Sequence, residues 1–284
     1  MELYRVENLT FTYPGQFAPA LRDVSLTLRA GEFVTLCGLS GSGKSTLLRQ
    51  LKTALAPNGV RSGAVLFAGR LLSDVSPREQ AERIGFVQQS PENQIVTDKV
   101  WHELAFGPES LGYDTPTIRR RVAEMAGFFG MESWFHRETA SLSGGQKQLL
   151  NLAAVLTLQP DVLILDEPTA QLDPIAAADF LAALARVNRE LGTTVLLSEQ
   201  RLEEALPLSD RAVVLDGGAV LADGAPRAVG AQLRTAGHEL FRAMPAAMRV
   251  WAAVENDLPC PVSVREGRDW LADFAASHPL KSVP

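Results

Sequence analysis

The chain has 284 residues and a mass of 30.7 kDa, with 46% hydrophobic residues, 21% charged residues and a formal net charge of -6. This composition can bury a sizeable core, either in one large α/β domain with an appendage or in two small domains. The mildly acidic balance, without a run of Lys and Arg, argues against a nucleic-acid binder.

The two cysteines form no disulfide framework, which fits a reducing interior, and Cys37 is expected to be a buried small hydrophobe. The N-terminus lacks the charged-then-apolar profile of a signal peptide. No apolar run approaches the ~20 residues that cross a bilayer. If the protein works at a membrane, we expect another protein to hold it there.

Short apolar strands alternate with helices along the chain. The strands are expected at residues 4–9, 24–28, 33–37, 84–87, 162–165, 195–197 and 212–215, and the helices at 44–55 and 176–191, with an apolar stripe through Ala178, Leu181 and Leu184 in the second. Amphipathic helices between residues 100 and 158 are interpreted as a helical insertion, and residues 216–218 as a turn. This order predicts a largely parallel sheet covered on its faces.

Residues 38–45, GLSGSGKS, match the phosphate-binding loop pattern in full, between an apolar strand and a helix. The glycines allow backbone N–H groups to converge on phosphate oxygens, and the helix adds the positive end of its dipole. Lys44 is expected to hold the β- and γ-phosphates and Ser45 to bind Mg²⁺. The expected nucleotide contacts in this segment are Gly38, Ser40, Gly41, Ser42, Gly43, Lys44, Ser45 and Thr46.

Two carboxylates, Asp166 and Glu167, end the apolar strand that begins at Val162. Strand ends face the ligand crevice in nucleotide-binding folds. Asp166 is therefore expected to hold Mg²⁺ and Glu167 to polarise the attacking water. Alone, such a pair is more often an ordinary turn, but the phosphate loop makes it the expected second half of a site.

Residues 142–148, LSGGQKQ, predict a helix start in which Ser143 is the N-cap and Gln146 completes a capping box. Two glycines in the first turn weaken a helix by roughly a kcal/mol each. This cost makes sense where a phosphate approaches the backbone closely.

Residues 142–146 resemble the signature sequence of ABC ATPases, and the resemblance covers about residues 3–224. It implies an α/β fold: a phosphate-loop NTPase (RecA-like) core with a mostly parallel sheet, a small antiparallel β region and an inserted helical subdomain at about 90–158. We expect an ABC ATPase domain at 1–229 and a C-terminal subdomain of unknown role at 230–284, where prolines such as Pro245 and Pro279 interrupt short helices.

The resemblance also implies ATP hydrolysis with Mg²⁺ in a head-to-tail pair with a second ABC ATPase subunit, identical or different. Ser143, Gly145 and Gln146 would contact the nucleotide of the partner, so isolated chains would be nearly inactive. Tyr13 matches the aromatic residue that stacks on adenine, and Asp173 the aspartate of a loop that reaches across the dimer.

Two glutamine positions follow from the same resemblance. Gln89 matches the residue that senses Mg²⁺ and the attacking water, although Gln88 is adjacent and could be confused with it. Gln200 stands where the family has a switch histidine, and glutamine can donate hydrogen bonds but cannot carry a positive charge. Either Gln200 is a working substitute, or this site is slow and a companion subunit turns over. The second interpretation is preferred, since the four histidines offer no obvious replacement.

Residues 91–96, PENQIV, and 104–109, LAFGPE, resemble ATPases of energy-coupling-factor (ECF) importers, and residues 169–175 and 198–204 resemble the thiamine-precursor or cobalt-type branch. The resemblance implies two ATPases that dock on a transmembrane coupling protein, while a separate membrane protein captures the vitamin, vitamin precursor or metal ion. The coupling helix would bind in a groove at Gln89–Gln94, and the chain would be peripheral on the cytoplasmic face of the membrane. Glu92 would pair with an arginine of that helix, or simply begin a helix near Pro91.

Three alternatives remain. The chain could serve an ABC transporter of another class, or it could be a nearly non-hydrolysing regulatory subunit, which Gln200 permits. A soluble ABC ATPase that acts on DNA or ribosomes is less consistent with the sequence. The segment from residue 47 to 142 is too short for long coiled coils, and only one phosphate loop is present.

Overall fold

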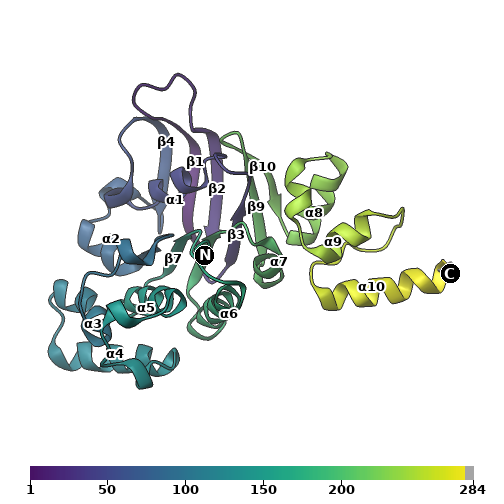
Figure 1. Cartoon of the computed structure of the whole chain (residues 1–284). Coiled ribbons are helices and arrows are strands. Elements are labelled where there is room, and N and C mark those ends of the chain that lie inside the picture. Colours follow the sequence, from purple (N-terminus) through teal and green to yellow (C-terminus); the bar gives the residue numbers. More distant parts are fainter. Residues whose placement is uncertain (279–284) are drawn as a thin grey trace.

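The computed structural model describes residues 1–278, and residues 279–284, which include Pro279, lie outside the described residues. Two sheets lie side by side at the centre, with helices below them and at both sides (Figure 1). None of the helices in residues 1–278 has the length and apolar character needed to span a membrane.

The larger sheet has six strands within the described residues, and its inner strands are parallel. In order across the sheet they are β10 (Ala219–Gly224), β9 (Arg211–Asp216), β3 (Phe33–Cys37), β8 (Thr194–Ser198), β7 (Val162–Asp166) and β6 (Ile84–Val87). All residues of β3, β6, β7 and β8 are buried, including Cys37, because the sheet is covered on both faces. The carboxyl ends of these four strands therefore meet at one edge.

The smaller sheet is antiparallel and has the order β2 (Leu21–Arg29), β1 (Glu2–Thr12), β4 (Val60–Phe67) and β5 (Arg70–Leu71). The predicted strands 4–9 and 24–28 are the centres of β1 and β2. The sequence did not predict β4, because its first half is exposed and Gly63, with a positive φ of 85°, interrupts the apolar pattern. Gly63 passes so close to β1 that a Cβ there would lie 2.4 Å from the carbonyl oxygen of Asn8.

The first helix, α1 (Lys44–Gln50), is shorter than the predicted helix at 44–55. Lys52 is extended, and its ammonium donates to the carbonyl of Ile84 at 2.6 Å. The chain therefore leaves the helix to contact β6, and only a short 3₁₀ turn, η1 (Thr53–Leu55), follows.

The helix predicted at 176–191 is α6 (Pro174–Leu191), which ends at Gly192 in the left-handed conformation with φ 70°. Its buried face includes Leu181 and Leu184 as predicted. The prediction for Ala178 was wrong, because Ala178 is exposed and the neighbouring Ala177 is buried instead.

The insertion forms an arm at the lower left of Figure 1 with a hydrophobic cluster of its own. Its elements are η3 (Pro91–Asn93), α3 (Val100–Ser110), α4 (Thr115–Phe128), η4 (Glu132–Trp134), η5 (Thr139–Ser141) and α5 (Gly144–Leu156). The helix α5 also packs against β6 and α6, so this helix joins the arm to the core.

The last helices lie on the opposite side of the molecule from this arm (Figure 1). They follow α7 (Leu202–Ala205) and η6 (Leu206–Leu208), and are α8 (Pro226–Thr235), η7 (Glu239–Ala243), α9 (Ala246–Ala252) and α10 (Val264–Ser277). Trp251 and Trp270 share one hydrophobic cluster with Val214 of β9, so this segment packs on the edge of the larger sheet. The predicted turn at 216–218 is confirmed and joins β9 to β10.

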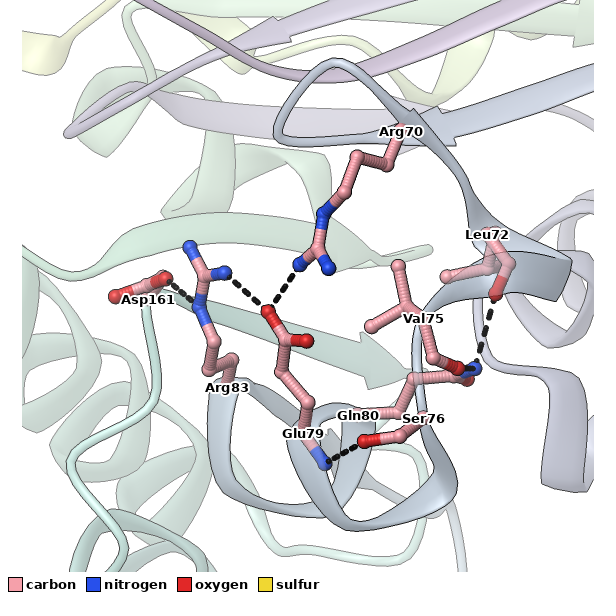
Figure 2. A network of polar contacts seen from close by, with 8 residues as sticks. All are labelled: Arg70, Leu72, Val75, Ser76, Glu79, Gln80, Arg83 and Asp161. Carbon is pink, nitrogen blue, oxygen red and sulfur yellow. Dashed lines mark hydrogen bonds and ion pairs between the residues drawn. The ribbon is translucent and has the colours of Figure 1, made fainter.

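An ionic network ties the two sheets together through α2 (Pro77–Arg83), as Figure 2 shows. The Glu79 carboxylate accepts from Arg70 of β5 and, at 2.7 Å, from Arg83, and Arg83 also donates to Asp161 at 2.7 Å. The two arginines hold the pKa of Glu79 below its ordinary value, chiefly through the hydrogen bond from Arg70. The buried Gln80 donates to the carbonyl of Leu72, which begins η2 (Leu72–Asp74), and to that of Val75, which follows it.

Candidate nucleotide site

A cavity of about 520 Å³ opens at the carboxyl ends of the parallel strands. It is lined by Tyr13, Gln16, Ala20, Ser40, Gly41, Gly43, Lys44, Ser45, Thr46, Gln89, Glu167 and Gln200. The loops that follow β3, β6, β7 and β8 all contribute, because these strands end at the same edge. The fold therefore brings residues that are far apart in the sequence, from Tyr13 to Gln200, to the phosphate-binding loop.

The loop between β3 and α1 has the backbone geometry that the glycine pattern predicts. Gly41 and Gly43 have φ of 79° and 102°, a region that residues with a Cβ rarely adopt. A Cβ on Gly38 would lie 2.3 Å from the carbonyl oxygen of Leu215, and one on Gly43 would lie 2.7 Å from that of Ala20. Close packing therefore requires glycine at positions 38 and 43, and the positive φ favours glycine at position 41.

The cation of Lys44 is held inside this loop. Its side chain is only 4% exposed, and its ammonium donates to the carbonyls of Gly38 at 2.9 Å and Leu39 at 3.2 Å. The hydroxyl of Ser42 is buried beside Gly38 and has no hydrogen-bond partner among the described residues. The buried Lys44 ammonium and the Ser42 hydroxyl are both donors that can bind the oxygens of a phosphate group.

The hydroxyl of Ser45, which lines the cavity, donates to the Asp166 carboxylate at 2.8 Å, and both residues line an adjoining hollow. Burial raises the pKa of Asp166, and the charge of Glu167 adds to this effect, while Ser45, Arg49 and Lys44 oppose it. A hydroxyl and a buried carboxylate are the hard oxygen donors that Mg²⁺ takes in phosphate sites. These two residues therefore fit the predicted magnesium ligands.

Glu167 lies between two donors. One of its oxygens is 3.6 Å from the Lys44 ammonium, and the other accepts from the Gln200 amide at 2.8 Å. Its backbone has φ 46°, and its N–H donates to the carbonyl of Ser198 at the end of β8. This strained turn directs the carboxylate into the cavity. None of the four histidines lines the cavity.

Tyr13 forms the wall of the cavity next to α1. Its ring packs edge-to-face on Phe11 at 4.9 Å between centroids, and its hydroxyl lies 3.0 Å from the Thr46 hydroxyl. The ring is thereby fixed beside the first turn of α1, where a flat base could stack on it. Gln16 and Ala20 complete this wall, although the sequence carried no signal for either residue.

The two neighbouring glutamines have different surroundings. The backbone N–H of Gln88 donates to the Gln94 side chain at 3.0 Å, and its carbonyl accepts from Gln148 of α5 at 3.1 Å. Gln89 is exposed and lines the cavity with Glu167. Both glutamines also line an adjoining hollow of about 420 Å³ that reaches Asp166.

The remaining predicted residues lie elsewhere. The Ser143 hydroxyl accepts from the Gln146 backbone N–H at 3.3 Å, and the Gln146 side-chain oxygen accepts from the Ser143 backbone N–H at 3.0 Å. The predicted capping box is therefore confirmed. Both residues and Gly145 line a second hollow of about 290 Å³. Asp173 caps α6 by accepting from the N–H groups of Ile175 and Ala176. Within one chain these residues do not line the Lys44 cavity.

Known proteins match the chain over this region. The family model described as ABC transporter matches residues 21–170. A Bacillus anthracis protein, whose name describes an ABC transporter ATP-binding protein, is 45% identical over 275 residues, which are 95% of this chain but 49% of that protein. A Methanosarcina acetivorans protein with the same description is 37% identical over 227 residues, or 80% of this chain and 69% of that protein. The chain thus spans about half the length of the Bacillus relative.

Two solved structures are similar. CbiO1 from Clostridium perfringens, part of the ABC transporter complex CbiONQ, superposes with a TM-score of 0.74 and 31% identity over 85% of this chain and 96% of that one. The cassette MJ0796, a dimer in a post-hydrolysis state with ADP and Pi, gives 0.68 and 26% identity over 78% and 98%. With the phosphate loop, the acidic pair and the glycine-rich helix start at their expected places, the chain belongs to the ABC transporter family as one of its ATP-binding ATPase cassettes.

Proposed function

We propose that this chain is the ATP-hydrolysing subunit of an ECF-type importer of a vitamin, a vitamin precursor or a metal ion. The observation that carries the ATPase part is the single cavity in which Tyr13, the Lys44 loop, Gln89, Glu167 and Gln200 meet. The similarity to CbiO1, part of a CbiONQ complex, supports the importer type.

In the proposed reaction the residues of the site perform three tasks, which are binding the nucleotide, binding Mg²⁺ and activating water. Tyr13 stacks on the adenine, while Lys44 and the loop N–H groups hold the phosphates. Ser45 and Asp166 would hold Mg²⁺, which would offset phosphate charge when bound. Glu167 orients and polarises the attacking water, with Gln89 beside it.

The contact between Gln200 and Glu167 suggests how the terminal phosphate activates the site. Both Glu167 oxygens have a partner in the structure: one lies 3.6 Å from the Lys44 ammonium, and the other accepts from the Gln200 amide. A terminal phosphate draws both donors away, which frees the carboxylate to accept a hydrogen bond from water. Gln200 then performs the positioning part of the histidine's task but supplies no positive charge.

A head-to-tail dimer would complete the site. Ser143, Gly145 and Gln146 line a separate hollow on the same chain, so a facing cassette is needed to bring such a helix start to the nucleotide. In this arrangement Asp173 and the exposed Ile175 lie at the contact between the cassettes. The dimeric state of MJ0796 supports this arrangement.

The docking site for a transmembrane coupling protein is proposed at Gln89–Gln94. Glu92 is 61% exposed and pairs with Lys147 of α5 at 3.0 Å. An arginine of the coupling protein would compete with Lys147 for this carboxylate, and the loss of that pair would loosen α5 from the groove. The chain would then lie peripherally on the cytoplasmic face of the membrane, while a separate membrane protein captures the substrate.

We propose a division into a cassette, residues 1–229, and a C-terminal subdomain, residues 230–284. The change from strand-helix alternation to short helices after β10 supports two parts, although α8 (Pro226–Thr235) continues through the proposed boundary. The hydrophobic cluster that these helices share with β9 ties the subdomain to the cassette rather than to an independent partner.

The test is purification of the full chain from membranes of its host. We expect a coupling membrane protein and a second ATPase cassette to co-purify, and the Glu167→Gln variant to lower turnover of the complex by at least about 100-fold. Fast turnover by the purified chain alone, with no membrane protein attached, would contradict the importer assignment.

A nearly non-hydrolysing regulatory subunit is the second candidate, and the absence of a histidine from the cavity lining favours it. The two candidates differ in the same preparation. In the regulatory case Glu167→Gln leaves turnover unchanged, because the companion cassette performs all hydrolysis.

A further inference from the structure

Glu199 is a buried carboxylate that the reaction above does not use. Its side chain follows β8, and the residue is only 2% exposed. Within residues 1–278 no Lys, Arg or His forms a salt bridge with it. A buried charge costs free energy unless polar partners compensate, so its surroundings need an explanation.

The two oxygens of Glu199 bind two different segments. One oxygen accepts from the backbone N–H of Thr169 at 3.3 Å and from the Thr169 hydroxyl. The other accepts from the backbone N–H groups of Gln200 at 2.9 Å and Arg201 at 3.2 Å. The carboxylate therefore joins the loop after Glu167 to the segment that carries Gln200.

Two further contacts join the same segments. The Arg201 guanidinium donates to the Leu172 carbonyl at 2.7 Å, and the Gln200 amide donates to Glu167 at 2.8 Å. The loop from 167 to 172 leads directly to Asp173, the N-cap of α6. Residues 199–201 and 167–173 are thus tied together by both side chains and backbone.

We propose that Glu199 is a positioning residue that couples the Gln200 segment to the loop 167–173, so that both segments respond to nucleotide as one unit. The proposal rests on the proposed function, since it assumes that Gln200 faces the terminal phosphate and that Asp173 faces the other cassette. Glu199 would then transmit the state of one site to the surface that the neighbouring cassette contacts.

The chemistry of the carboxylate explains why a neutral residue would not serve. All four partners are donors, and an ionised carboxylate only accepts. In Glu199→Gln one oxygen becomes an NH₂ group that faces one or two backbone N–H donors, so at least one of these backbone contacts is lost while side-chain size is retained.

Hydrogen exchange on the full chain, with and without Mg·ATP, tests the coupling directly. In the wild type we expect ATP to slow exchange in peptides that cover the Lys44 loop, residues 198–203 and residues 166–173. In Glu199→Gln we expect the Lys44 loop to remain protected, while the ATP-induced protection of 166–173 is lost.

Glu103→Gln is the matched control. Glu103 is another buried glutamate, 5% exposed, which accepts from Val96 and Thr97 in the helical arm. We expect a comparable fall in melting temperature and wild-type ATP responses in all three peptides. A merely structural role for Glu199 would give the same result in both variants.

Three outcomes are decisive. Wild-type protection of 166–173 by ATP in Glu199→Gln would overturn the coupling role, as would equal losses in the Glu103→Gln control. If Glu199→Gln does not fold, Thr169→Val removes one donor to the same carboxylate in a residue of the same shape, and must weaken the response of 166–173. No ATP protection of the Lys44 loop in the wild type would instead contradict the proposed function.

Discussion

At the scale of single residues, the base pocket depends on one hydroxyl pair. The Tyr13 hydroxyl lies 3.0 Å from that of Thr46, whose oxygen is expected to face the phosphates. Tyr13 can donate to Thr46 while Thr46 donates to a phosphate oxygen, so one chain of hydrogen bonds links the base wall to the phosphate loop.

We predict that Tyr13→Phe weakens ATP binding by about 3- to 10-fold, the effect of one hydrogen bond of about 1 kcal/mol. Tyr13→Ala is expected to weaken it further, because stacking on a base contributes about 1–3 kcal/mol. Calorimetric titration with ATP measures both. Equal affinities for wild type and Tyr13→Phe would show that the hydroxyl pair is not used.

Asp166 contributes a pH-dependent cost to the stability of the folded chain. Burial raises its pKa, so the folded state disfavours the ionised form, and stability falls as pH rises from the ordinary aspartate pKa to the raised value. We predict that Asp166→Asn raises the melting temperature at pH 7, because the amide has no charge to bury and its oxygen can still accept from Ser45.

The difference in melting temperature should vanish below the ordinary aspartate pKa, where the wild-type carboxyl is protonated in both states. Thermal unfolding without nucleotide at pH 7 and pH 3 measures it. A lower melting temperature for Asp166→Asn at pH 7 would contradict the cost assigned to this carboxylate.

Gln200→His is predicted to raise turnover of the assembled complex about 10-fold or more, because an imidazolium adds a positive charge beside the terminal phosphate. Steady-state hydrolysis by wild-type and variant complexes is the measurement. An unchanged rate would mean that the amide is adequate or that another step limits turnover.

At the scale of elements, the helix α5 combines two roles that can be separated. Ser143 caps the helix, and its hydroxyl is expected to meet the phosphate of a facing cassette. Aspartate is as good an N-cap as serine and suits the positive helix end, but its charge repels a phosphate.

We therefore predict that Ser143→Asp keeps the melting temperature within about 2 °C of the wild-type value, whereas Ser143→Ala lowers it by about 2–4 °C, because a lost cap costs ~1 kcal/mol. Hydrolysis by the assembled complex should nevertheless fall most in Ser143→Asp. If Ser143→Ala instead loses more activity than Ser143→Asp, in line with its lower melting temperature, then Ser143 serves only as a helix cap.

The elements also show what the sequence could predict. The Lys44 loop and the Asp166–Glu167 pair are local patterns, and they occur in the structure where the strands and glycines require them. The strand β4 and the contact between Glu92 and Lys147 were not predictable from local pattern, because they depend on partners far along the chain. The same holds for Glu199, whose partner Thr169 is 30 residues away. Tyr13, Gln89 and Gln200 were predicted only through family resemblance.

At the scale of the whole molecule, the nucleotide cavity and the hollow at Ser143 are separate features of one chain. The arm that carries α5 lies on one side of the sheets, and the C-terminal helices lie on the other (Figure 1). In the proposed dimer, the α5 helix of a second cassette would therefore face the Lys44 loop.

The most direct measurement is the mass of the Glu167→Gln chain in sedimentation with Mg·ATP, alone and with the cassette that co-purifies with it. Slow hydrolysis should preserve the ATP-bound pair, so we predict the mass of a two-cassette complex with ATP and of single chains without it. Lys44→Ala or Ser143→Asp in the same background should abolish the association. Single chains at saturating ATP in both mixtures would contradict a nucleotide held jointly by two cassettes.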